Sequence, residues 1–60
     1  MPFQDITTTI AQPAERVDFD AVKLAAKKVV VPGATDTHGC QVTSVAGVPG
    51  GTSVTIRVVT

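Results

Sequence analysis

The chain has 60 residues, and a domain of this size buries only about 60% of the surface that its unfolded chain exposes. Five lysine and arginine residues balance five aspartate and glutamate residues, so the formal net charge is zero. This balance excludes a strong overall field that would attract nucleic acid or an anionic membrane. The opening residues lack the basic and apolar regions of a signal peptide, and no apolar run is long enough to span a membrane.

Domains this small usually need a further source of stability, such as disulfides, a structural metal or a partner chain. Cys40 is the only cysteine, which excludes an internal disulfide. Cys40 and His38 supply only two of the four ligands that structural zinc normally takes. Phe3 and Phe19 are the only aromatic residues, so large core side chains are scarce. We therefore expect another protein chain to complete part of the core, in a homo-oligomer or on a larger subunit.

Residues 1–16 are predicted to form an extended N-terminal arm. In an extended conformation, Ile6, Thr8 and Ile10 share one face of a strand. Such a strand can pair through main-chain hydrogen bonds with a sheet edge, either in its own subunit or in a neighbour. For the first few residues a disordered tail is an equally good alternative. The rest of the chain, residues 17–60, is predicted to form a small β domain.

Residues 17–31 fit two interpretations. A helix is plausible because Asp18 or Asp20 can serve as its N-cap, and two lysines lie near its expected end. A pair of strands is plausible because apolar and charged residues alternate at the start of the segment. We favour two short strands around a turn at residues 25–28, with the valine run at residues 29–31 in the second strand.

The C-terminal half indicates a β-hairpin. Residues 40–45 are a strand candidate, and Pro49 followed by Gly50 is the order that a type II turn requires. In the last strand, Val54, Ile56 and Val58 fall on one face, which we expect to be buried. The predicted fold is mainly β: a small antiparallel sheet or a sandwich- or barrel-like module with an extended N-terminal arm, and with room for one short helix around residues 18–28.

The segment Asp36-x-His38-x-Cys40 is the only candidate for a catalytic dyad or a metal half-site. No other histidine or cysteine exists in the chain to complete such a site, and Gly39 gives the segment the character of a loop. We therefore interpret His38 as a turn residue and Cys40 as a small buried side chain. The sequence predicts no catalytic residue, no metal site and no cofactor.

One basic cluster, formed by Lys23, Lys27 and Lys28, offers an alternative function as a small regulatory or nucleic-acid-associated module. No aromatic residues are interleaved with these lysines, so a stacking platform for single-stranded bases is missing. We interpret the cluster as a solvated face with Asp18 and Asp20 as counter-charges. Nucleic acid is accordingly not the partner that we expect.

Three segments resemble small β-modules of bacteriophage virion proteins: DFDAVKLAA at residues 18–26, VVVPGA at residues 29–34 and VTIRVV at residues 54–59. The resemblance covers about half the chain and rests on strand and turn patterns. It departs at residues 27–28, where two lysines replace the glycine and small polar residues of those modules. It implies a capsid-decorating or tail-associated role in the virion, with capsid or tail subunits as partners, and carries over no catalytic residue.

We therefore expect a non-enzymatic structural component of a larger protein assembly, made in the host cytoplasm without a signal peptide. The expected interaction residues lie on two strands. The arm would add a strand to a neighbour, and the last strand would bury its apolar face in a shared core. These residues are Ile6, Thr8, Ile10, Val54, Ile56 and Val58.

Overall fold

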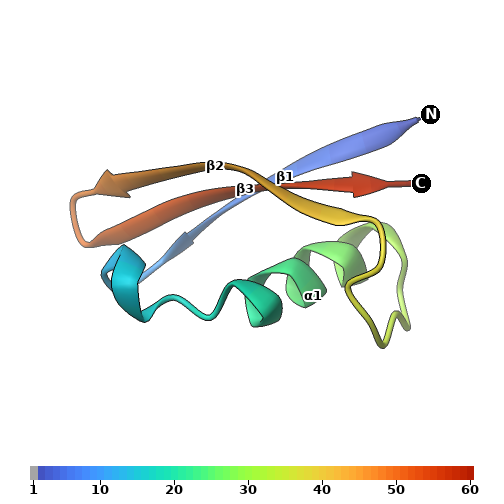
Figure 1. Ribbon diagram of the computed structural model, residues 1–60, viewed down its shortest axis with the longest axis horizontal. Coiled ribbons are helices and arrows are strands. Elements are labelled where there is room, and N and C mark those ends of the chain that lie inside the picture. Colours follow the sequence, from blue (N-terminus) through green and yellow to red (C-terminus); the bar gives the residue numbers. More distant parts are fainter. Residues whose placement is uncertain (1) are drawn as a thin grey trace.

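A computed structural model describes residues 2–60. The elements in chain order are strand β1 (Phe3–Ile10), a short 3-10 helix η1 (Ala14–Arg16), helix α1 (Phe19–Val30), strand β2 (Cys40–Val48) and strand β3 (Gly51–Val59) (Figure 1). The strands form one antiparallel sheet in the order β1-β3-β2, and α1 lies against one of its faces. This architecture confirms the prediction of a mainly β fold with a small antiparallel sheet and one short helix.

Strand β1 occupies the segment that the sequence predicts to be an arm. It pairs with β3 without interruption, from Phe3 opposite Val59 to Ile10 opposite Thr52. Alternate residues of β1 are half-buried on the face toward α1, as the spacing of its apolar residues predicts. Strand β1 and the two strands of the C-terminal half therefore belong to one sheet, while the end of the predicted arm forms η1. Met1, the first residue of the expected arm, lies outside the described residues.

Helix α1 shows that the prediction of two short strands around residues 25–28 is wrong. The helix begins after Asp18, whose carboxylate accepts a hydrogen bond from the backbone N–H of Ala21 at 3.3 Å. Val22 and Ala26 lie one turn apart and are both buried against the sheet. The cap and this helical spacing outweigh the alternating pattern that suggested strands.

The end of α1 corrects the predicted strand at residues 29–31. Val29 and Val30 are the last two residues of the helix, and Val31 is its C-cap. The helix stops there because Pro32 disfavours a helical conformation of the residue before it. Two lysines in the last turn complement the negative end of the helix dipole.

Strand β3 is the central strand, and its inner face is the centre of the core. Val54, Ile56 and Val58 have no exposed surface, and α1 and the linker residue Val17 pack against them. This confirms the predicted buried face of the last strand, whose alternate residues are half-buried. Residues of the same chain cover these three side chains, so none of the three exposes surface to a partner.

The β2–β3 hairpin confirms the predicted turn. Gly50 follows Pro49 and has a φ of 88°, a conformation that L side chains rarely adopt and that a type II turn requires at this position. Strand β2 is less regular than β1. Its pairing with β3 shifts between Val42 and Ser44, which leaves Thr43 as the extra residue of a bulge.

Candidate functional site

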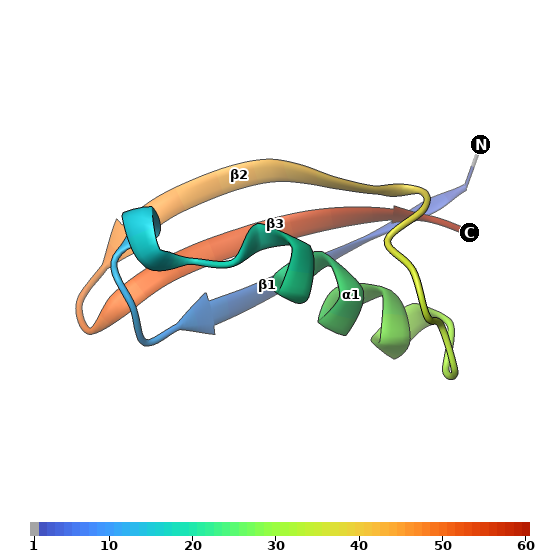
Figure 2. The same cartoon turned by 60° about the horizontal axis from the view of Figure 1, so that its bottom comes forward.

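One edge of β1 pairs with β3, and the other edge has no neighbouring strand in the described chain (Figure 2). The backbone N–H of Thr60 donates to the carbonyl of Pro2 at 3.1 Å, so Pro2 points its carbonyl toward the side of β3. Because hydrogen-bonding direction alternates along a strand, the odd-numbered residues point theirs outward. These residues are Phe3, Asp5, Thr7 and Thr9.

An apolar groove runs beside this edge, between β1 and α1. Val29 on the groove's helical side is 67% exposed, the largest exposure of any bulky apolar residue in the described chain. Three predicted interaction residues line the groove from the strand, and four residues line it from the helix. They are Ile6, Thr8 and Ile10 of β1, and Val22, Ala25, Ala26 and Val29 of α1.

The predicted turn at Ala25 and the predicted strand at Val29 do not reveal the place of these two residues in the groove. Their signal was present in the sequence. Val22, Ala25, Ala26 and Val29 follow the spacing of one helical face, although this set contains no large residue to make the helix stand out. The remaining predicted interaction residues, on β3, are internal as described above.

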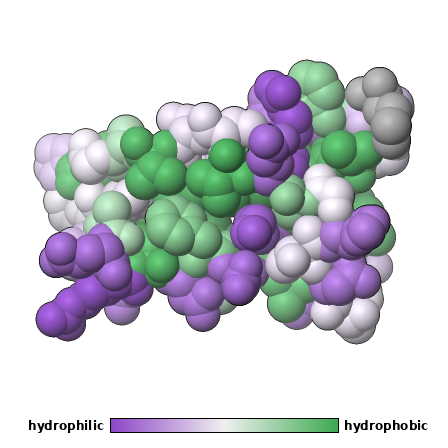
Figure 3. Space-filling model, in the orientation of Figure 1, coloured by the Kyte–Doolittle hydropathy of each residue, from purple (hydrophilic) through white to green (hydrophobic). Residues whose placement is uncertain are grey.

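The opposite edge of the sheet differs from β1. Strand β2 carries the bulge at Thr43, and a bulge twists an edge and interrupts its pairing pattern. Figures 1 and 3 share one orientation, and in it β1 lies at the back and is drawn fainter. Figure 3 therefore shows the side of the molecule that lies away from the β1 edge. Apolar side chains gather over the middle of that side. Of the two edges, β1 is the regular one.

The outer face of the sheet is polar and ties β1 to β3. Arg57 Nε donates to Asp5 Oδ1 at 3.2 Å, and the guanidinium lies 4.0 Å from the centre of the Phe3 ring. The hydroxyl groups of Thr7 and Thr55 are 3.1 Å apart and share a hydrogen bond. These contacts accompany the main-chain pairing of β1 with β3 in a single register over the whole strand.

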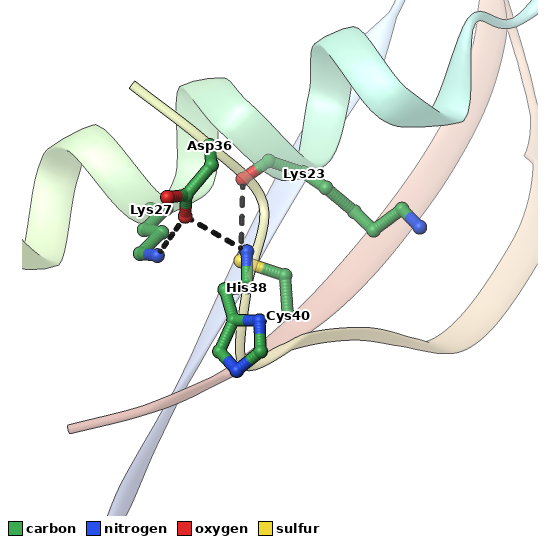
Figure 4. Close-up of polar contacts among 5 residues, drawn as sticks. All are labelled: Lys23, Lys27, Asp36, His38 and Cys40. Atoms are coloured by element: carbon green, nitrogen blue, oxygen red, sulfur yellow. Dashed lines mark hydrogen bonds and ion pairs between the residues drawn. The ribbon is translucent and has the colours of Figure 1, made fainter. Parts of the chain in front are cut away.

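The Asp36, His38 and Cys40 segment lies in the connection between α1 and β2 (Figure 4). Asp36 Oδ1 accepts hydrogen bonds from Lys27 Nζ at 2.7 Å and from the backbone N–H of His38 at 3.1 Å. The Cys40 thiol donates to the backbone carbonyl of Lys23 at 3.6 Å. Among residues 2–60 no hydrogen bond joins the His38 ring to the thiol, and the contacts of Asp36 and Cys40 fasten the loop to the helix.

The Lys27 ammonium, and then the His38 backbone N–H, hold the pKa of Asp36 below its ordinary value. A lowered pKa in the folded state adds stability above the pKa of the unfolded chain, and this stability is lost as the pH falls through the folded pKa. We expect an NMR titration to place the Asp36 pKa below that of an unpaired aspartate. Lys27→Met should raise it.

The matched control is Lys28→Met, because Lys28 is exposed and forms no ion pair within the described chain. It should leave the Asp36 titration unchanged. An Asp36 carboxyl that titrates like an unpaired aspartate in the unmodified protein would contradict the contacts described here.

The basic cluster is partly neutralised by the chain itself. Lys23 Nζ lies 3.5 Å from Asp20 Oδ1, and Lys27 is paired with Asp36. Lys28 is exposed. The three lysines therefore do not form a single open basic patch.

Two further findings concern the described part of the chain. Within residues 2–60, no three histidine, cysteine, aspartate or glutamate side chains come close enough together to hold a metal ion. Neither helix in that range has the combination of length and apolar character that crossing a membrane requires. The chain matches no protein-family model, no curated protein and no solved structure.

Proposed function

We propose that this protein is a structural subunit of a larger protein assembly and that it joins its partner through the free edge of β1. The observation that carries the proposal is the coincidence of two features. The outward backbone groups of β1 form a regular pairing template, and the apolar groove lies directly beside them. Strand addition uses both features, because main-chain hydrogen bonds give affinity and neighbouring pockets take alternate side chains.

The regularity of the β1 edge supports this proposal. Proteins that avoid edge-to-edge pairing usually place lysine, proline or a bulge on an exposed edge strand. Strand β1 has none of these over Phe3–Ile10, and its one charged residue, Asp5, is held by Arg57 on the outer face. An eight-residue strand left in this form suits a partner that covers it.

The assembly that we propose is a bacteriophage virion, in which the protein decorates the capsid or belongs to the tail. This specific choice is supported by the sequence resemblance of residues 18–26, 29–34 and 54–59 to modules of virion proteins. The β1 edge would then bind a capsid or tail subunit or a further copy of the chain. No enzymatic activity is part of the proposal.

The test is a proline at the centre of the free edge. Thr7→Pro removes an outward N–H but no main-chain hydrogen bond to β3, so the isolated fold should survive the additional loss of the hydroxyl contact with Thr55. A strand added at this edge would lose a main-chain bond and meet the proline ring. We expect the variant to be folded by circular dichroism but absent from virions purified on a density gradient, as measured by mass spectrometry.

Thr7→Val is the matched control. It keeps the backbone N–H and a β-branched side chain, and it loses only the hydroxyl contact with Thr55. It should enter particles at the level of the unmodified chain. A Thr7→Pro protein that enters particles as well as Thr7→Val would refute docking through β1, and the absence of the unmodified chain from particles would refute the virion assignment.

A further inference from the structure

We infer that the partner at the β1 edge is a second copy of this chain, bound with β1 antiparallel to β1 about a two-fold axis at Thr8. This inference rests on the proposed function and names the occupant of the same site. The pairing would join two three-stranded sheets into one continuous sheet with both helices on the same face. The choice of partner follows from backbone direction, side-chain pairing and charge.

Backbone direction restricts the register. Only the odd-numbered residues of β1 point their N–H and C=O groups toward the free edge. Across a two-fold axis at Thr8, Thr7 of each copy lies opposite Thr9 of the other, so outward groups meet outward groups. A register shifted by one residue would place odd-numbered residues opposite even-numbered ones, whose backbone groups are already used by β3.

The same register pairs the apolar side chains. Ile6 of each copy lies opposite Ile10 of the other, and the two Thr8 side chains meet at the axis. These residues face α1 and line the groove, where they are only half-buried in the single chain. Opposed residues that do not exchange hydrogen bonds come closest in an antiparallel pair, with Cα atoms about 4.5 Å apart. Pairing would therefore remove the strand side of both grooves from water at once.

Charge also allows two identical edges to meet. Asp5 is the only charged residue of β1, and Arg57 of the same chain holds it on the outer face. In this register Asp5 lies opposite Ala11 of the second copy, so no like charges oppose each other. The chain has a formal net charge of zero, which leaves no overall repulsion between copies. The bulged β2 edge offers no comparable self-complementary stretch.

Disulfide trapping at the axis tests the inference. In a Cys40→Ser background, Thr8→Cys would place two cysteines across the axis at a Cα separation within the roughly 4.4–6.8 Å range that disulfides require. We expect mild oxidation to convert most of this protein into a covalent dimer. Thr7→Cys in the same background should stay monomeric on a non-reducing gel. Position 7 of one copy lies opposite Thr9 of the other copy, so the two introduced cysteines do not face each other.

A second variant pair tests the contact without cross-linking. Thr8→Lys sets two like charges opposite each other at the axis, whereas Thr9→Lys adds the same charge on the exposed outer face. Light scattering should give the mass of one chain for Thr8→Lys and of two chains for Thr9→Lys and the unmodified protein. Circular dichroism confirms that each variant is folded.

The outcomes separate this inference from the proposed function. An unmodified chain that stays monomeric up to millimolar concentration, with no Thr8→Cys cross-link, overturns the second copy as partner. If Thr7→Pro still blocks entry into particles, the proposed function stands with another chain at the β1 edge. A dimer that cross-links at Thr7 in preference to Thr8, or that survives Thr8→Lys, overturns the inference as well.

Discussion

Gly51→Ala is expected to lower the free energy of unfolding by about 3 kcal/mol, the upper end of what overpacking costs. A Cβ atom at Gly51 would overlap the carbonyl oxygen of Ile10, at the corner where β1 ends and β3 begins. The obstructing atom belongs to the backbone, so no flexible side chain can move aside. A chain of 60 residues has roughly 3–9 kcal/mol of total stability, so much of the variant should be unfolded.

Gly47→Ala provides the matched control for this substitution. Gly47 lies in β2 and pairs with Thr52, but a Cβ atom there would meet nothing within 4 Å. Urea unfolding followed by circular dichroism should place its midpoint at or slightly above that of the unmodified chain, because alanine restricts the unfolded state. Equal midpoints for the two variants would show that β1 does not approach β3 as closely as described.

Ile56→Ala is expected to cost about 2–5 kcal/mol of unfolding free energy. Ile56 is fully buried at the centre of the middle strand, opposite Ile6 on one side and Val42 on the other. Removing most of its side chain would leave a cavity between the sheet and α1 that the surrounding backbone cannot fill. The described residues form one hydrophobic core cluster, and Ile56 is at its centre, so the loss should appear as a large fall in the urea midpoint.

Val45→Ala is the control for Ile56→Ala. Val45 lies on the edge strand β2 and is 44% exposed, so truncating it removes little buried surface. It should shift the midpoint by less than about 1 kcal/mol of unfolding free energy. A core that tolerates Ile56→Ala as easily as Val45→Ala would contradict the placement of β3 at its centre.

The sequence was most informative where local chemistry and long-range packing agree. Pro49 and Gly50 specify their turn, and the alternation of Val54, Ile56 and Val58 specifies the buried face of β3. Residues 19–30 were harder to predict because valine and alternating charges favour strand while the Asp18 cap favours helix. Only the sheet beneath α1 resolves that conflict, because Val22 and Ala26 gain a core to pack against when the segment is helical.

The candidate site was half predictable. The spacing of Ile6, Thr8 and Ile10 placed them on one strand face, and that face lines the groove. The helical side of the groove has only the helical spacing of its small residues as a local signal, and its position beside β1 depends on how α1 lies across the sheet. Local patterns also do not predict the contact of Thr52. Its buried hydroxyl donates to the carbonyl of Gln12 at 2.8 Å and so ties the start of β3 to the turn after β1. This contact spans 40 residues of sequence.

The central claim is that assembly covers the free edge of β1. Amide hydrogen exchange tests it most directly, by comparing dilute protein with assembled protein. The account predicts that the N–H groups of Asp5, Thr7 and Thr9, which point outward in the single chain, exchange rapidly when dilute and become strongly protected on assembly. Assembled protein in which these amides still exchange as rapidly as in the dilute chain would contradict the claim.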